Sequence, residues 1–407
     1  MAENEEPTVP GSSLTTVLVT LPRGMLGVEA GPRPTAAIRN LLSAIPRSRR
    51  LILAGHDAAL CAAEKWPEIV GRKPTFVPVE DDIDFTVWAQ DGLLAVHRND
   101  GMPAFLLPAI ARRPGNRDII HRVAAALGIA CMKAAFDFEG GNILIGSQHV
   151  LVGVDTPLTS EFLTFVERGG RRAVSIGSEE VLPRPYVRLV ESDGTPIVEE
   201  MLGFAGLRQP LFHLDLFASL AGMSEDGRQV VFVGDVRLAR RQVGNMLPEV
   251  DPRIADALDM SAQSLKATGA FLVLRNPLPI VPVMHSGGGL WSRAAVERRL
   301  GGLPGASGVM RELHARRLSR VAVRRWRALS QNCCVVFEDP DDRRVLLPKY
   351  AEGQYAYLEP CERHNAALWR QRGYRVTEVA GAQAFAFENG SLHCVLKEIY
   401  DAPAIRS

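Results

Sequence analysis

A short pattern of two β-rich runs joined by a turn recurs along the 407-residue chain, and this recurrence is the strongest constraint on its fold. In each copy, Asn, Asp, Gly or Pro residues separate runs of β-branched, aromatic and Leu residues, which is the sequence signature of a hairpin. The predicted pairs of runs are Trp88–Val96 with Ala104–Leu107, Phe138–Ile145 with His149–Val154, His213–Leu220 with Gln229–Val233, Cys333–Phe337 with Val345–Leu347, and Ala384–Phe387 with Leu392–Ile399.

Helical stretches lie between these runs, at Ile119–Ala126, Leu158–Glu167, Pro252–Thr268 and Ala366–Arg372. A further β-rich run, Thr16–Leu21, opens the pattern. The sequence therefore predicts an α/β protein built from repeated strand-strand-helix-strand modules. Modules of this kind are expected to pack in a closed or radial arrangement around a common centre.

The chain contains no linker rich in Gly, Ser or Pro that would divide it into halves. We expect a loose polar lead at residues 1–12 and one domain at 13–407, with a helical, Arg-rich insertion at about 289–330. The segment Arg311–Arg327 has seven arginines in 17 residues and a helical pattern. A solvated helix face is the default interpretation, and a docking surface for an acidic protein, peptide or nucleic acid is the alternative.

Composition excludes several function classes. The chain carries 47 Lys and Arg against 46 Asp and Glu, which argues against a general nucleic-acid surface. The longest apolar runs fall far short of the roughly 20 residues that cross a bilayer, and the acidic N-terminus does not resemble a secretory signal. The six cysteines include no C-x-x-C pair, so reduced thiols and a cytoplasmic location are predicted, without a structural zinc site.

Polar residues with catalytic potential lie in or beside the predicted hairpins. If the modules are radial, these residues converge on the centre although they are far apart in the chain: Asp91, Glu139, His213 with Asp215, Asn332, and Cys394. Alternate side chains of a strand share a face, so His213 and Asp215 are predicted to point the same way. By the same rule His393 and Cys394 point to opposite faces, which makes His213 the preferred base for the thiol.

Four strings in this order resemble the signatures of the guanidine-modifying superfamily of deiminases and amidinotransferases. They are WAQD at 88–91, FEGGN at 138–142, HLD at 213–215 and GSLHC at 390–394. The resemblance extends from about residue 15 to 400 and is nearest to the agmatine deiminase and bacterial peptidyl-arginine deiminase branch. It implies a five-bladed pseudo-symmetric α/β propeller with the active site on its axis, in agreement with the repeated modules.

The resemblance also implies a role for each matched residue. Cys394 would be the nucleophile that attacks the guanidinium carbon, and His213, steadied by Glu139, would transfer protons. The residues implied in substrate binding are Asp91 and Asp215, which would hold the guanidinium nitrogens, Asn332, which matches an Asn of the peptidyl-arginine branch, and Trp88, which would pack beside the substrate or serve in the core.

The chemistry requires these residue types. A guanidinium group is planar and always charged, so paired carboxylates hold it best. A thiolate is the strongest nucleophile available when a nearby cation lowers its pKa. Attack would release ammonia and leave a covalent thiouronium, which water would hydrolyse to a ureido product, with no metal or organic cofactor.

The sequence predicts a guanidino deiminase, a C–N hydrolase of linear amidines, and leaves the substrate open among agmatine, arginine and peptidyl arginine. An amidinotransferase with the same Cys-His-acid site and a catalytically silent arginyl-peptide-binding module remain alternatives. Gln90 stands where the superfamily commonly has Arg, which places substrate preference in question. The expected partner is a guanidino small molecule or an arginyl peptide, without membrane or nucleic acid, and a homodimer is left open.

Overall fold

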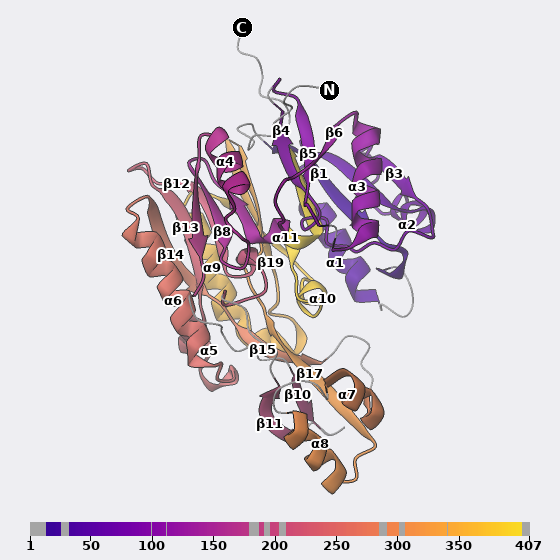
Figure 1. Cartoon of the computed structure of the whole chain (residues 1–407), viewed down its shortest axis with the longest axis vertical. Helices are drawn as coiled ribbons and strands as arrows, with labels where there is room; N and C mark the ends of the chain where they lie inside the picture. The colour runs from indigo at the N-terminus through magenta and orange to yellow at the C-terminus, as the bar shows by residue number, and fades with distance from the viewer. Residues whose placement is uncertain are drawn as a thin grey trace.

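Five sheets of the same topology make up the body of the protein (Figure 1). The computed structural model describes residues 14–25, 32–98, 100–110, 112–178, 187–190, 196–202, 209–284, 291–300, 306–339 and 341–400. In each of the five sheets the first strand runs antiparallel to the second, and the second runs parallel to the third. The predicted strand-strand-helix-strand module is therefore present in repeated form.

Four of these sheets are built from segments that are consecutive in the chain. They comprise β4 (Leu94–His97), β5 (Pro103–Leu107) and β6 (Ala130–Lys133); β7 (Ile143–Ile145), β8 (His149–Gly153) and β9 (Arg172–Ile176); β12 (Ala218–Met223), β13 (Gln229–Asp235) and β14 (Phe271–Pro277); and β18 (Val335–Asp339), β19 (Asp342–Pro348) and β20 (Arg375–Val379).

The fifth sheet joins the two ends of the described chain. Its first strand, β21 (Leu396–Tyr400), pairs antiparallel with β1 (Leu14–Leu21), and β1 pairs parallel with β2 (Arg50–His56). A fourth strand, β3 (Thr75–Val79), follows α2 (Asp57–Ala63) at the edge. The last segment of the chain therefore completes a sheet begun by the first.

Helices connect the second and third strands of each sheet. They are α1 (Pro32–Ala44), α3 (Pro114–Leu127), α4 (Ser160–Arg168), α5 (Val236–Val243) with α6 (Pro252–Ala267), and α9 (Glu359–Gln371). Local sequence sets their ends. The first turn of α3 contains Pro114, whose missing N–H costs nothing there, and its C-cap Gly128 takes the left-handed φ of 68° that glycine tolerates.

The second strand of each sheet sends alternate side chains into two different hydrophobic clusters. In β13, Val231 and Val233 pack with the β7–β9 sheet, whereas Val230 and Phe232 pack toward β19 and α9. Because neighbouring residues of a strand point to opposite faces, such a strand is apolar throughout and buried on both sides. Five clusters of this kind join consecutive sheets, and the last of them joins the fifth sheet to the first.

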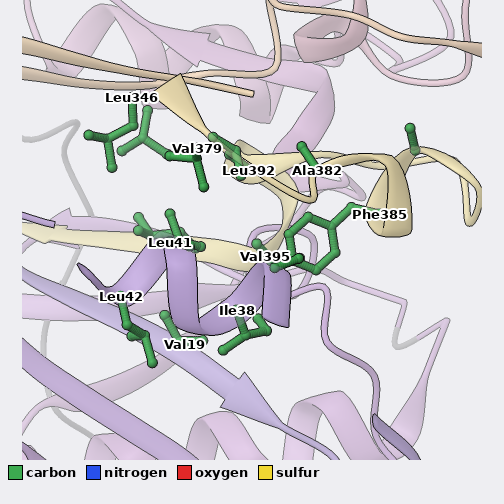
Figure 2. Packing of buried hydrophobic residues seen from close by; sticks show 14 of the residues in the cluster. Val19, Ile38, Leu41, Leu42, Leu346, Val379, Ala382, Phe385, Leu392 and Val395 are labelled. Atoms are coloured by element: carbon green, nitrogen blue, oxygen red, sulfur yellow. The ribbon is translucent and has the colours of Figure 1, made fainter. Parts of the chain in front are cut away.

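The cluster between the fourth and fifth sheets holds the C-terminal segment in place (Figure 2). Leu392 and Val395 belong to α11 (Leu392–Val395) and pack with Leu41 of α1 and with Phe385 of α10 (Gln383–Ala386). Both α11 side chains are fully buried. Leu392 and Val395 precede and follow Cys394, so their packing fixes the turn of helix that carries it to the core.

Two local predictions for this region and its neighbours are wrong. Ala384–Phe387 and Leu392–Ile399 do not form a hairpin, because α10 and α11 occupy most of these runs and β21 pairs with β1 from the other end of the chain. A local pattern cannot reveal such a distant partner. In addition, the strands after Trp88, Phe138 and His213 begin only at Leu94, Ile143 and Ala218, since turns precede them.

A sixth sheet lies apart from the five, in the lower part of Figure 1. It contains β10 (Val187–Val190), β11 (Pro196–Leu202), β15 (Ile280–Met284), β16 (Trp291–Ser292) and β17 (Arg320–Ala328), with α7 (Arg293–Leu300) and α8 (Ala306–Ala315) beside it. The helix predicted over Arg311–Arg327 is wrong, because α8 ends at Ala315 and β17 pairs with both β10 and β15. The segment predicted as a helical insertion at about 289–330 thus contains strands as well as helices in its described residues.

Among the described helices, none combines the length and apolar character that a bilayer crossing requires. The predicted loose lead at residues 1–12 lies outside the described residues.

The packing of Phe232 predicts a large loss of stability on truncation. Its side chain is fully buried, and the centroids of its ring and the Trp369 ring are 4.7 Å apart. Phe232→Ala therefore leaves a cavity between β13 and α9. We expect the free energy of unfolding to fall by about 3–5 kcal/mol in a denaturant titration. Val70→Ala, at a position that is 62% exposed, should change it by less than about 0.5 kcal/mol. Equal effects of the two changes would contradict the assigned packing.

Candidate active site

The predicted site residues occupy equivalent places, in the turn or short helix just before the first strand of a sheet. Asp91 precedes β4, Glu139 precedes the 3-10 turn Gly140–Asn142 and β7, His213 and Asp215 precede β12, Asn332 precedes β18, and Cys394 precedes β21. Because the five sheets share one topology, this position recurs at the same end of each. Convergence of the residues follows from the repeat of the module.

Hydrogen bonds connect these pre-strand segments directly. The amide of Gln90 donates to the carbonyl of Cys394 (3.1 Å), and the amide of Gly140 donates to the carbonyl of Asp91 (3.2 Å). The amide of Leu214 donates to Asn142 Oδ1 (3.0 Å). Hydrogen bonds from backbone amides therefore hold together segments that lie far apart in the chain.

His213 and Asp215 do not lie in a strand as predicted. His213 caps the 3-10 turn Leu214–Leu216, which contains Asp215. Both side chains nevertheless reach one place, since a Cβ on Gly141 would lie 2.6 Å from His213 Nδ1 and 3.3 Å from Asp215 Oδ2. Only glycine fits at position 141 without displacing the imidazole.

An imidazole with two carboxylates forms one side of the site. His213 Nε2 lies 3.2 Å from Glu139 Oε2, and His213 Nδ1 lies 3.7 Å from Asp91 Oδ1. Burial by itself favours neutral imidazole, but the hydrogen bond with Glu139 and the nearby carboxylates outweigh it and raise the pKa of His213. Burial raises the pKa of Asp91, only partly offset by His213. Burial also opposes ionisation of Glu139, yet its bond with His213 brings its pKa below the ordinary value.

A thiol beside a carboxylate forms the other side. Cys394 Sγ lies 3.5 Å from Asp215 Oδ2, and His393 Nδ1 lies 2.8 Å from the same oxygen. Cys333 Sγ lies 3.4 Å from Cys394 Sγ and 3.7 Å from Asp215 Oδ2. The neighbouring Cys333, burial and the charge of Asp215 all raise the pKa of Cys394 well above its ordinary value. The thiol is therefore protonated unless a cation enters beside it.

Two arginines that the sequence analysis did not select cover the carboxylates from outside. A surface cavity reaches Asp91 and Glu139, and its walls include Arg112 and Arg113. Arg112 Nη1 donates to Glu139 Oε2 (2.7 Å), and Arg113 Nη1 lies 3.5 Å from Asp91 Oδ2. Both arginine side chains remain 40% exposed or more, so they can move away when another cation binds.

A buried lysine contacts Gln90, the residue at which this chain differs from the Arg that is common in the superfamily. Lys397 Nζ donates to Gln90 Oε1 (3.1 Å), and Gln90 Nε2 lies 3.4 Å from the carbonyl of Gly140. Burial lowers the pKa of Lys397 to about 8. Instead of a charged residue at position 90, this protein has a buried lysine, Lys397, which is the second residue of β21 and follows shortly after Cys394.

Asn332 and Trp88 occupy the periphery. Asn332 Oδ1 accepts from Ser219 Oγ (3.3 Å), and the side chain lines a cavity of about 570 Å³ that also reaches Asp215 and His393. Trp88 packs over Gly390, where a Cβ would lie 2.4 Å from the indole. Trp88 also contacts the small cluster that contains Cys394. Gly390 is thus required by the close approach of Trp88.

Sequence reasoning missed His393, Cys333 and the arginine pair for different reasons. His393 was set aside because Cys394 was placed in a strand, whereas both belong to α11. Cys333 was not selected as a site residue, although it adjoins the selected Asn332. Arg112 and Arg113 carry no distinguishing sequence signal among the other arginines of the chain.

No protein-family model matches the sequence, and no curated protein matches it. Solved structures do. The agmatine deiminase of C. jejuni is 15% identical with a TM-score of 0.58, and the alignment covers 97% of this chain and 96% of that one. An agmatine deiminase of Enterococcus faecalis is 13% identical with a TM-score of 0.58, covering 98% and 96%.

The chain has the fold of the agmatine deiminases. The resemblance to the guanidine-modifying superfamily that the four strings indicated is therefore confirmed at the level of the fold. The mixed α/β class is likewise confirmed.

The surroundings of Cys394 predict its reactivity with a neutral reagent. Since its pKa is raised, alkylation by iodoacetamide should accelerate with pH along a curve whose midpoint lies above about 8.5, the ordinary value for cysteine. Mass spectrometry of the Cys394 peptide, in a Cys61→Ser background that removes an exposed thiol, measures this rate. A midpoint at or below the ordinary value would show that the thiolate is already stabilised without a ligand.

Proposed function

We propose that this protein is a hydrolytic guanidino deiminase that acts through a covalent cysteine intermediate. The observation that carries the proposal is the placement of two carboxylates, the buried Asp215 beside the thiol of Cys394 and the 11% exposed Asp91 beside the imidazole of His213. The fold shared with agmatine deiminases supports it.

Substrate binding would satisfy buried groups that lack partners. Asp91 Oδ1 and Asp215 Oδ1 have no hydrogen-bond partner among the described residues. A buried carboxylate oxygen in that condition is costly, and a planar guanidinium carries five N–H donors that suit paired carboxylates. The carboxylates would therefore orient the guanidinium with its carbon facing the thiol.

The same cation would activate the nucleophile. A guanidinium next to Cys394 opposes the charge of Asp215 and favours the thiolate, so the thiol proton is released when substrate binds. The thiolate would then form a bond to the guanidinium carbon. His213, which its carboxylate neighbours keep protonated, would give its proton to the departing nitrogen, and ammonia would leave.

Hydrolysis would return the enzyme to its starting state. His213, now neutral, would take a proton from water as the water attacks the thiouronium carbon. Breakage of the carbon–sulfur bond then gives the ureido product, and the proton of its former hydroxyl passes to the departing sulfur, so that Cys394 is again a thiol. Glu139 would hold His213 in orientation through both steps.

We further propose that the five sheets form a five-bladed propeller in a single catalytic domain. The support is the chain of five hydrophobic clusters, which links each sheet to the next and the fifth to the first. The sixth sheet with α7 and α8 would then be the insertion, and a cytoplasmic location would suit its reduced thiols.

The arginine pair favours a substrate that carries a carboxylate as well as a guanidinium. Arg112 and Arg113 would be released from Glu139 and Asp91 when a guanidinium binds, and they would stand at the opening of the cavity. Two exposed guanidinium groups there can pair with a substrate carboxylate. Free arginine would use this contact, and agmatine, which has no carboxylate, would not.

Replacing the nucleophile tests the reaction. Cys394→Ala should lower ammonia and ureido production by a factor of about 10³ or more, because no other group can form the covalent intermediate. Agmatine, arginine and a blocked arginyl peptide are assayed in parallel, with Cys61→Ala, an exposed cysteine, as the matched control. Turnover by Cys394→Ala comparable to the wild type would refute the nucleophile assignment.

The same assay separates the alternatives. An amidinotransferase would form product only when an amine acceptor is added, without free ammonia. A silent binding module would turn over none of the substrates and would leave Cys394 unlabelled by a cationic haloacetamidine, which mass spectrometry detects.

The arginine pair gives a substrate-specific prediction. Arg112→Ala should raise the KM for arginine about tenfold or more through loss of a charge-assisted hydrogen bond. The KM for agmatine should stay the same, since agmatine has no carboxylate for Arg112 to bind. Arg363→Ala, at an exposed position of α9, is the control. Equal changes for the two substrates would remove Arg112 from carboxylate recognition.

A further inference from the structure

The buried centre contains a set of donor atoms that sequence spacing does not reveal. Cys333 Sγ, Cys394 Sγ and Asp215 Oδ2 come from three separate pre-strand segments, and all lie within 4.8 Å of one another. All three residues are buried, at 0%, 3% and 1% exposure. Two thiols with a carboxylate are a donor set suited to a soft or borderline divalent metal ion.

The distances within this set match a face of a tetrahedral zinc site. Zinc–sulfur bonds of about 2.3 Å and zinc–oxygen bonds of about 2.0–2.2 Å place sulfur atoms about 3.8 Å apart, and sulfur and oxygen about 3.5–3.6 Å apart. The observed separations are 3.4 Å between the two sulfurs and 3.5 and 3.7 Å from the sulfurs to Asp215 Oδ2. Shifts of a few tenths of an ångström would complete the geometry.

A second observation concerns the other oxygen of the same carboxylate, which lies outside the donor set. Asp215 is 1% exposed, and its Oδ1 has no hydrogen-bond partner among the described residues. His393 Nδ1 lies 2.8 Å from Oδ2 and can hold the carboxylate in orientation from outside the donor set. Asp215 and His393 line the cavity of about 570 Å³, which offers an ion a route to the centre.

We infer that Cys333, Cys394 and Asp215 form a binding site for one Zn²⁺ ion, with a water from the cavity as fourth ligand. Binding converts both thiols to thiolates and releases two protons to solvent. The inference needs no deiminase activity. If the proposed function holds, the bound ion occupies the nucleophile and the guanidinium-binding carboxylate, so it acts as an inhibitor and excludes substrate.

Cobalt(II) as a spectroscopic probe tests the site without reference to catalysis. The full chain, freed of metal and kept reduced with a phosphine, is titrated with Co²⁺ under anaerobic conditions. We expect one equivalent to produce thiolate-to-cobalt charge-transfer bands and the intense visible bands of tetrahedral Co²⁺, and added Zn²⁺ to abolish them. A wild-type spectrum with only the weak bands of hydrated Co²⁺ overturns the site.

Variants assign the ligands. Cys333→Ser and Cys394→Ser should each weaken Co²⁺ binding by at least about tenfold and reduce the charge-transfer intensity, since loss of a ligand costs at least as much as loss of an outer-shell contact. Cys361→Ser, a buried thiol next to the carbonyl of Ala239, is the matched control and should bind as the wild type does. Circular dichroism establishes that each variant is folded. If one of the two ligand variants does not fold, the other still tests the site.

The outcomes separate this inference from the proposed function. Normal Co²⁺ binding by Cys333→Ser, or an equal loss in Cys361→Ser, overturns the assignment whatever the protein catalyses. Deimination by a wild-type protein that shows no thiolate bands leaves the function standing and removes the metal site. Thiolate bands in a protein without deiminase activity support the site and count against the function.

Discussion

The cost of keeping carboxylates together in a buried centre governs this structure. Asp91, Glu139 and Asp215 lie close enough for their like charges to repel, and burial, complete at Asp215 and partial at the other two, weakens screening by water. His213, whose pKa these carboxylates raise, and the arginine pair lie against Glu139 and Asp91. Asp215 contacts His393 and two thiols, and its charge also acts on His213. The arginines therefore lie on the Asp91 and Glu139 side of the centre, and a guanidinium or a metal ion would bind on the other side, beside Cys394.

That centre can exist because the framework around it is apolar on both faces of every central strand. Alternate side chains of β13 enter different clusters, and the same alternation recurs in β1, where Val17 and Val19 face one cluster and Leu18 the next. The polar residues of these strands lie mostly at their ends, as Gln229 and Asp235 do in β13, and the predicted site residues lie in the turns that precede the sheets. Burial of the apolar framework stabilises the fold, and this offsets the free-energy cost of burying carboxylates in the centre.

The repeated module could be predicted from turn residues and β-rich runs, since both signals are local. The four strings predicted the fold through their order. The prediction that His393 faces away from the site was wrong, because the strand rule was applied to a segment that forms a turn of helix. Helix α11 is anchored by Leu392 and Val395 in a core made largely by other segments, and no pattern within seven or eight residues contains that information.

The sequence by itself determined the module, the residue types of the site and their order, because these depend on local periodicity and on the chemistry of individual side chains. Only the tertiary structure decided which atoms face each other. The pairing of β21 with β1 brings Cys394 to Cys333 and Asp215, and the loop before α3 brings Arg112 to Glu139. Distances of 3 to 4 Å between residues far apart in the chain result from the packing of whole sheets, which acts over the entire chain at once.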